Sequence, residues 1–129
     1  MNYAFHHIHL VSSDLERLRV FFVEALGAVD RGAKSFGPAG GRKLELDGVR
    51  IYLRGEKPGE KRKPANTGLR FGYDHIGLAV ADVPAACAAL EGHGAVVLDA
   101  PRQTPSGWVA FVRGPDGIVI ELYDPVEDD

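Results

Sequence analysis

The chain has 129 residues, of which 45% are hydrophobic and 26% charged, and its formal net charge is −3. This length and hydrophobic content suit one globular domain. A negative balance argues against a nucleic-acid partner, and no apolar run approaches the ~20 residues that a membrane span needs. The single cysteine, Cys87, cannot form an intramolecular disulfide and fits a reducing compartment. We therefore expect a cytoplasmic protein.

The N-terminal half begins with a predicted strand over residues 4–11. Ser13 follows, with Glu16 three positions later, in the pattern of a helix N-cap. Apolar residues at helical spacing come next, and Gly27 suits the left-handed conformation that ends a helix. These signals predict a helix of about three turns behind the first strand.

Four glycines and a proline then fall within residues 32–41, and this composition predicts a mobile loop. Two alternating runs, residues 43–46 and 49–54, are joined by Asp47-Gly48, so they predict a β-hairpin. Residues 55–68 are charged and interrupted by prolines and glycines, and we expect them to link two halves of the chain.

The C-terminal half shows a similar order of signals. A strand ends at Val80, and Asp82 is placed to cap a helix that runs to about residue 91. Further strands are expected at residues 95–98, 108–113 and 118–123, with a loop at 99–107 and a turn at 114–117.

The two halves also share a sequence pattern. His7 and His75 each begin an alternating apolar run that leads to an aspartate, Asp14 or Asp82, and the shift between the two copies is 68 residues. A repeat at half the chain length indicates a duplicated unit. We expect a single domain over residues 1–129 that contains two modules, each with a strand, a helix and three strands, at residues 4–54 and 69–124.

Three side chains with metal-ligand chemistry lie on equivalent faces of this pattern. Because strand side chains alternate between two faces, His7 and His75 point away from the helix-packed side of their strands. Glu121 does the same in the last strand, where a buried carboxylate without a partner is costly. Two imidazoles and a carboxylate suit Fe, Mn, Ni, Co or Zn as divalent ions. The alternative is a salt bridge from Glu121 to Arg50 or Arg54.

Several motifs together resemble the vicinal oxygen chelate superfamily, which includes glyoxalase I, extradiol dioxygenases and bleomycin- and fosfomycin-resistance proteins. They are the repeated His-x6-Asp, the helix end Phe21-Phe22…Leu26-Gly27, and Gly-Pro-Asp-Gly followed by Glu121. The resemblance implies an α+β fold in which tandem βαβββ modules form a cupped, eight-stranded mixed sheet with helices outside. It implies a divalent metal held by His7, His75 and Glu121 and chelated by two adjacent substrate oxygens, and a homodimer.

The chain departs from individual members of that superfamily. Tyr52 stands where glyoxalase I carries a fourth ligand, Glu or Gln, and Val11 stands where its glutathione-contacting Arg is expected. Fosfomycin-resistance proteins carry Thr at the position of His9 and Tyr at the position of Phe111. These differences argue against a true glyoxalase I and a true fosfomycin-resistance enzyme.

Further residues are assigned to the same concave face. The candidates for catalysis are His9, Tyr52 and Glu45, because they lie on the metal-facing side of their strands. An anionic small-molecule substrate would be held by arginine forks and aromatic rings, for which the candidates are Arg50, Arg54, Trp108, Phe111 and Tyr123.

The leading functional hypothesis is a metal-dependent, glyoxalase-type lyase or isomerase acting on a small substrate with adjacent oxygens. A second hypothesis is an Fe(II) extradiol-type dioxygenase, for which two His and one carboxylate are a suitable set. The third is a metal-free ligand-binding protein of the bleomycin-resistance type.

Overall fold

In the computed structural model of the protein, which describes residues 1–65 and 70–126, the chain divides into two units. Unit one spans residues 1–62 and unit two residues 63–129. The boundary lies in the segment expected to link the two modules, of which residues 66–68 fall outside the described residues. In the described part of the chain, no helix is long and apolar enough to cross a membrane.

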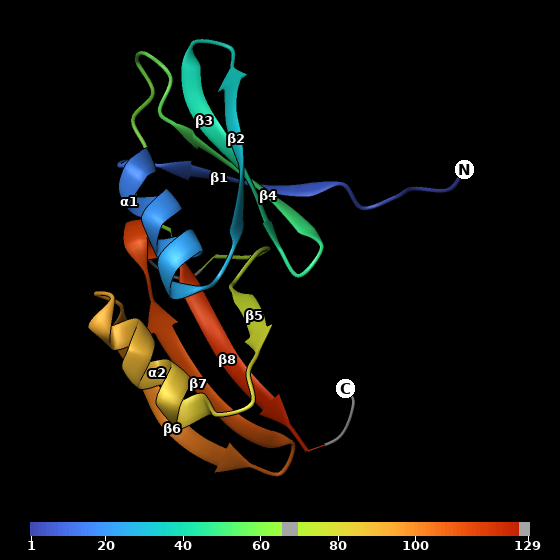
Figure 1. Cartoon of the computed structure of the whole chain (residues 1–129), viewed down its shortest axis with the longest axis vertical. Coiled ribbons are helices and arrows are strands. Elements are labelled where there is room, and N and C mark those ends of the chain that lie inside the picture. Colours follow the sequence, from blue (N-terminus) through green and yellow to red (C-terminus); the bar gives the residue numbers. More distant parts are fainter. Residues whose placement is uncertain (66–69, 127–129) are drawn as a thin grey trace. The chain divides into compact units, whose positions relative to one another are not determined.

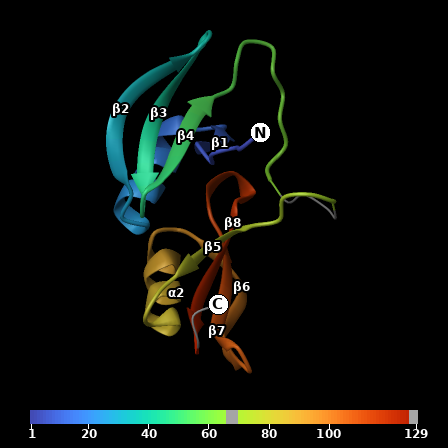
Figure 2. The ribbon, with the colours of Figure 1, turned by 90° about the vertical axis from the view of Figure 1, so that its right-hand side faces the viewer.

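Unit one contains a four-stranded sheet with helical segments after its first strand (Figure 1). Its elements are β1 (His7–Ser12), α1 (Leu15–Val20), a π-helical turn (Phe21–Ala25), β2 (Val29–Phe36), β3 (Ala39–Leu46) and β4 (Val49–Gly55). The strand order is β1-β4-β3-β2, with β1 parallel to β4 and the other pairs antiparallel. Figure 2 shows β2, β3 and β4 side by side.

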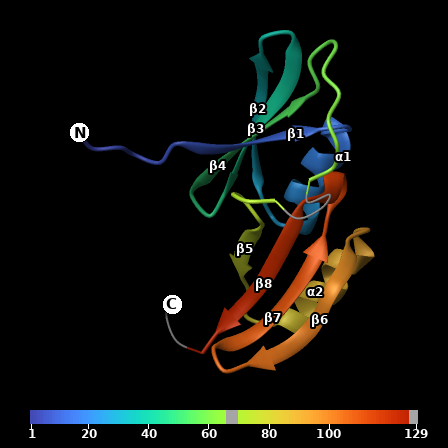
Figure 3. The same ribbon diagram turned by 180° about the vertical axis from the view of Figure 1, so that it is seen from behind.

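Unit two repeats this architecture. Its elements are β5 (Ile76–Ala79), α2 (Val83–Gly92), β6 (Val96–Thr104), β7 (Gly107–Arg113), a 3-10 turn (Pro115–Gly117) and β8 (Val119–Pro125). The strand order is β5-β8-β7-β6, again with one parallel pair, β5 and β8. Figure 3 shows β6, β7 and β8 beside one another, with α2 packed on the sheet that they form.

The α+β class and the two βαβββ modules are thus confirmed, with the predicted eight strands divided between two four-stranded sheets. Each sheet buries one face against its helix. Leu18 of α1 and Leu53 of β4 are fully buried in unit one, and Val83 and Ile120 in unit two. This burial removes apolar side chains from water and is the main source of stability of each unit.

Both helices are capped by the aspartate of the repeated sequence pattern, Asp14 for α1 and Asp82 for α2. Ser13 was expected to cap α1, but the carboxylate of Asp14 accepts the backbone N–H of Arg17 at 3.1 Å. In unit two, Asp82 accepts the backbone N–H of Ala85 at 3.0 Å. The prediction of Ser13 is wrong because the repeated aspartates occupy equivalent positions and each satisfies an N–H group that the helix leaves unbonded.

Both predicted loops are in fact paired strands. Apart from the turns at 37–38 and 105–106, residues 32–41 belong to β2 and β3, and residues 99–107 belong to β6 and β7. Pro101 is tolerated because it lies in an irregular stretch of an edge strand, where no ladder N–H is required. Gly41 has a packing role, because a Cβ at this position would collide with the backbone carbonyl of Leu53 and with the ring of Phe36. In these two segments, a glycine allows close packing and a proline lies at an irregular point of a strand, so neither residue indicates a loop.

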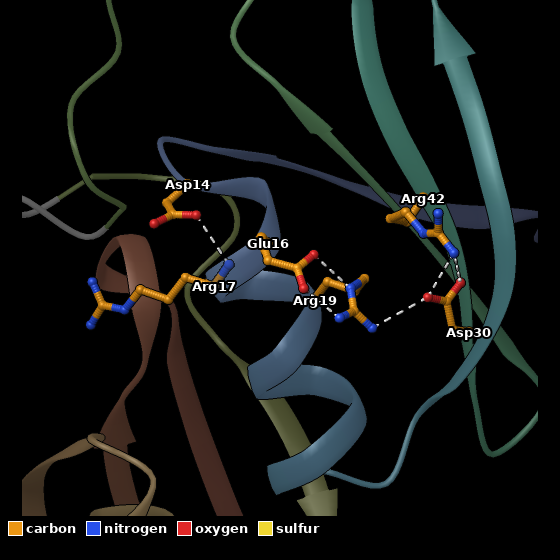
Figure 4. A network of polar contacts seen from close by, with 6 residues as sticks. All are labelled: Asp14, Glu16, Arg17, Arg19, Asp30 and Arg42. Carbon is orange, nitrogen blue, oxygen red and sulfur yellow. Dashed lines mark hydrogen bonds and ion pairs between the residues drawn. The ribbon is translucent and has the colours of Figure 1, made fainter.

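An ion-pair network joins α1 to two strands of unit one (Figure 4). Both carboxylate oxygens of Asp30 on β2 accept a hydrogen bond at 2.9 Å from Nη2 of Arg42 on β3. Nη1 of Arg19 lies 3.5 Å from the same carboxylate, and Nε of Arg19 donates to Glu16 at 2.8 Å. The network is partly buried and fixes the helix on the sheet side opposite to His7.

Candidate functional site

The residues of the predicted metal site that lie in unit two are in direct contact. Glu121 is aligned with Gly77 across the parallel β5–β8 pair, and His75 immediately precedes β5. The Nε2 atom of His75 lies 3.1 Å from Oε1 of Glu121, and the two side chains are 29% and 25% exposed. The ring of Phe111 meets the His75 ring edge-on, with 5.2 Å between centroids. Two of the three predicted ligands are therefore in contact within one module.

The second ring nitrogen of His75 also has a carboxylate partner. Its Nδ1 atom lies 2.8 Å from Oδ2 of Asp74. This hydrogen bond raises the pKa of His75, burial opposes the rise, and the contact with Glu121 adds to it. Asp74 is a site residue that the sequence analysis did not identify, although its place directly before the repeated histidine is a usable signal.

The separation of His75 Nε2 and Glu121 Oε1 is that of a hydrogen bond, and it is also compatible with two donors on one divalent ion. Two donors bound next to each other on an ion about 2.1 Å away lie roughly 3.0–3.4 Å apart, and the measured separation is 3.1 Å. A carboxylate oxygen and an imidazole nitrogen suit first-row divalent metals. A second carboxylate on the other ring nitrogen is the common arrangement for a metal-binding histidine.

The third predicted ligand, His7, belongs to unit one. It begins β1, is exposed, and stacks on the ring of Tyr52 with 4.4 Å between centroids. Its Nδ1 atom lies 2.9 Å from Nδ1 of His6. Within the described residues of each unit, three His, Cys, Asp or Glu side chains do not gather around one point. The three-residue ligand set crosses the boundary between the units and stays a prediction.

Two of the three predicted catalytic residues, His9 and Tyr52, lie together in unit one. They face each other across β1 and β4. Phe36 completes this group, with 4.6 Å from its ring centroid to that of His9 and 5.9 Å to that of Tyr52. The pKa of His9 is lowered, first by burial and then by the positive charge of Arg54. The sequence analysis missed Phe36 because it lies in the segment predicted to be a loop.

The arginines expected to bind substrate differ in their contacts. Arg54 is almost fully buried, and its guanidinium binds both carboxylate oxygens of Glu60 at 3.0 and 3.2 Å. This contact lowers the pKa of Glu60 to about 2. Arg50 is exposed, and its Nη1 donates a long 3.4 Å hydrogen bond to the carbonyl of His6. Neither contact is the predicted alternative salt bridge to Glu121.

The remaining predicted site residues are distributed over both units. Glu45 is paired with Arg31 at 2.9 Å. Phe111 and Tyr123 share the sheet face of Glu121, and the Tyr123 hydroxyl donates to the carbonyl of Ser106 at 3.3 Å.

The prediction that placed Trp108 on the substrate-binding face needs correction. The β7–β8 register aligns it with Asp124, so it shares the helix-packed face with the fully buried Ala110 and Val112. Residues 108 and 111 are an odd number of positions apart, which puts them on opposite faces of the strand. The structure therefore does not bring Trp108 to the face of Glu121.

Solved structures with the same fold cover nearly all of this chain. A glyoxylase/bleomycin resistance protein/dioxygenase domain from Frankia sp. EAN1pec is 22% identical, with a TM-score of 0.77 and coverage of 100% of this chain and 96% of that one. Fosfomycin resistance protein FosX from Listeria monocytogenes, in a complex with Mn(II) and 1S,2S-dihydroxypropylphosphonic acid, is 15% identical, with a TM-score of 0.73 and coverage of 98% and 95%.

A glyoxalase I mutant from Zea mays is 20% identical, with a TM-score of 0.73, and the match covers 95% of this chain and 45% of that chain. In addition, residues 4–122 match the Glyoxalase/Bleomycin resistance protein/Dioxygenase superfamily. The chain therefore belongs to this superfamily, as its motifs predicted.

Proposed function

We propose that the protein is a divalent-metal-dependent enzyme of glyoxalase type, which acts as a lyase or isomerase on a small substrate that chelates the metal through adjacent oxygens. The observation that carries the proposal is the pair of donor atoms on His75 and Glu121, 3.1 Å apart and partly buried. Membership of the superfamily supports it, as does a structural relative, FosX, that is described in complex with Mn(II).

In this proposal, His75, Glu121 and His7 hold the ion, which acts as a Lewis acid on the substrate oxygens. Neighbouring side chains hold His75 in place. The edge of the Phe111 ring rests against His75 and restricts its rotation. The Asp74 carboxylate fixes the opposite side of the same ring.

His9 is the proposed group that moves a proton. Its ring lies among those of Phe36 and Tyr52. The other candidate base, Glu45, is already engaged by Arg31. Tyr52 is placed beside His9 and can donate a hydrogen bond to a substrate oxygen.

The proposed substrate is anionic. Arg50 is the better candidate for its binding, since it is exposed and its contact with a backbone carbonyl is long. The guanidinium of Arg54 is occupied by Glu60, and we infer that it shapes the loop after β4. A planar guanidinium suits a carboxylate or phosphate because it can donate two parallel hydrogen bonds.

The second candidate is an Fe(II) extradiol-type dioxygenase. It uses the same two histidines and one carboxylate, a set that leaves open positions on iron. Metal identity separates the two candidates. Elemental analysis of the purified protein, followed by anaerobic reconstitution with Fe(II), is expected to show tight binding of a divalent ion that His75→Ala removes. Absence of binding by any of Fe, Mn, Ni, Co or Zn would favour the metal-free, bleomycin-resistance-type protein instead.

We also propose a two-fold homodimer that works in the cytoplasm. Each four-stranded sheet has two edge strands, and such edges are usually covered in a stable protein. Sedimentation at micromolar concentration should give the mass of a dimer, and a monomer would refute this part of the proposal.

A further inference from the structure

Asp74 contacts the ring nitrogen of His75 that faces away from Glu121. The Nδ1–Oδ2 distance is 2.8 Å, against 3.1 Å between Nε2 and Glu121 Oε1. The Asp74 side chain is 84% exposed, so it contributes little to the packing of unit two. A contact of this kind acts mainly on the histidine itself.

A neutral imidazole carries one proton, on either of its two nitrogens. In His75 both nitrogens face a carboxylate, so the proton has two possible acceptors. With the proton on Nε2, His75 donates to Glu121, and the two atoms proposed to bind metal are bonded to each other. With the proton on Nδ1, it is donated to Asp74, and the lone pairs of Nε2 and Oε1 are both directed at one place.

We propose that Asp74 is a positioning residue that holds the proton of neutral His75 on Nδ1, so that Nε2 and Glu121 Oε1 together accept a divalent cation. The inference rests on the proposed function, because His75 and Glu121 are the metal ligands there. The shorter of the two contacts is the one with Asp74. With the proton held on Nδ1, the lone pair of Nε2 and a lone pair of Glu121 Oε1, 3.1 Å away, are both available to one cation.

The first module has no carboxylate at the position equivalent to Asp74. The 68-residue shift aligns Asp74 with His6 and His75 with His7. In place of a carboxylate, His7 Nδ1 meets another imidazole nitrogen at 2.9 Å. His6 gives no negative charge to orient its neighbour, so the positioning is specific to unit two.

The test uses the full-length protein and Asp74→Asn, which keeps the size of the side chain and removes its charge. The tautomer of His75 is measured in the metal-free protein by long-range proton–nitrogen NMR, at a pH where His75 is neutral. Affinity for Co²⁺ alone is measured by calorimetry. Glu91→Gln is the matched control, because it removes one exposed acid from α2 in the same unit and has no contact with His75. Asp74→Ala is measured in the same way as a second variant.

Wild-type protein should carry the proton on Nδ1, and both Asp74 variants should move it to Nε2. Loss of a carboxylate behind a ligand histidine typically weakens metal binding by about 10–100-fold, and we expect a loss of that size. Glu91→Gln should match wild type in both measurements. Thermal unfolding of the Asp74 variants should be unchanged, so a general structural defect would not imitate the result.

The outcome that overturns the inference is an unchanged tautomer and unchanged Co²⁺ affinity in both Asp74 variants, while His75→Ala loses Co²⁺ binding. In that case the metal proposal stands and the role of Asp74 fails alone. If His75→Ala binds Co²⁺ as tightly as wild type, the metal proposal itself fails. The tautomer measurement, which needs no metal, still decides what Asp74 does to His75.

Discussion

The two modules share one backbone pattern but place different chemistry on it. In β1–β4, His9 is aligned with Tyr52, and at the equivalent place in β5–β8, Gly77 is aligned with Glu121. Beside the repeated histidine, module one has His6 where module two has Asp74. At these two equivalent places, module two therefore carries the carboxylates Glu121 and Asp74, where module one carries the phenol of Tyr52 and the imidazole of His6. A duplicated scaffold has kept its register while its two exposed sheet faces have become chemically distinct.

The modules also differ in how they pack this face. Val109 of β7 is aligned with Tyr123, and its equivalent in module one is Gly41, which is aligned with Arg54. The glycine leaves room for the ring of Phe36, which in turn contacts His9. Module two fills this space with the side chain of Val109 itself, whereas module one fills it with the ring of Phe36 from the edge strand β2.

The largest expected effect tests whether both modules contribute metal ligands. His75→Ala should abolish stoichiometric metal, and His7→Ala should cause a similar loss, because each removes one nitrogen donor. Elemental analysis after dialysis measures both variants. His93→Ala, at an exposed histidine that ends α2, is the control and should keep its metal. Full metal content in His7→Ala would confine the metal to module two and break the three-residue set.

The next effect concerns packing in module one. Gly41→Ala should lower the free energy of unfolding by about 1–3 kcal/mol, because the added methyl group meets the Leu53 backbone carbonyl and the Phe36 ring and overpacks the site. Gly40→Ala is the matched control, since open space surrounds that position, and a change within about 0.5 kcal/mol is expected. Urea unfolding measures both. Equal stability of the two variants would mean that Gly41 is not closely packed against the Leu53 carbonyl and the Phe36 ring.

The two arginines of β4 offer a smaller test. Arg50→Leu should weaken binding of small 2-oxo or 2-hydroxy acids by about tenfold to a hundredfold, the usual worth of a charged hydrogen bond. Metal content should not change. Arg54→Leu should instead lower the urea midpoint, because it leaves Glu60 without its buried partner. Unchanged acid binding in both variants, with metal retained, would contradict the anionic substrate.

The smallest expected effect is the pH dependence that the Arg54–Glu60 pair gives to unit one. The fold lowers the pKa of Glu60 from 4.5 to about 2, chiefly through Arg54. A lowered folded-state pKa means that the carboxylate stabilises the fold above about pH 4.5, and that this contribution is lost as pH falls towards 2. Wild type should therefore be more stable than Glu60→Gln at neutral pH, with the difference vanishing in acid. A difference that is constant with pH in urea unfolding would exclude this linkage.

Much of the fold could be predicted because its signals are local. The strand period places Ile118, Ile120 and Leu122 on the buried face and Glu121 on the other, as the structure confirms. The 68-residue repeat gives the order of elements in both modules. It also indicates the aspartate caps, and the error at Ser13 came from giving a local capping motif more weight than the repeat.

Tertiary structure decided the features that depend on partners distant in sequence or on a choice among several neighbours. Glycine-rich residues 32–41 form strands because β3 pairs on both sides and Phe36 packs over Gly41. Several carboxylates were possible partners for Arg54 from the sequence. It pairs with Glu60 because the loop after β4 brings that side chain next to it. Likewise, sequence placed Asp74 beside His75, but the rotation of the imidazole ring determines which nitrogen meets which carboxylate. Alternation and repetition fix which face a side chain occupies, whereas its hydrogen-bond partner is fixed only when the folded chain brings donor and acceptor to within about 3 Å.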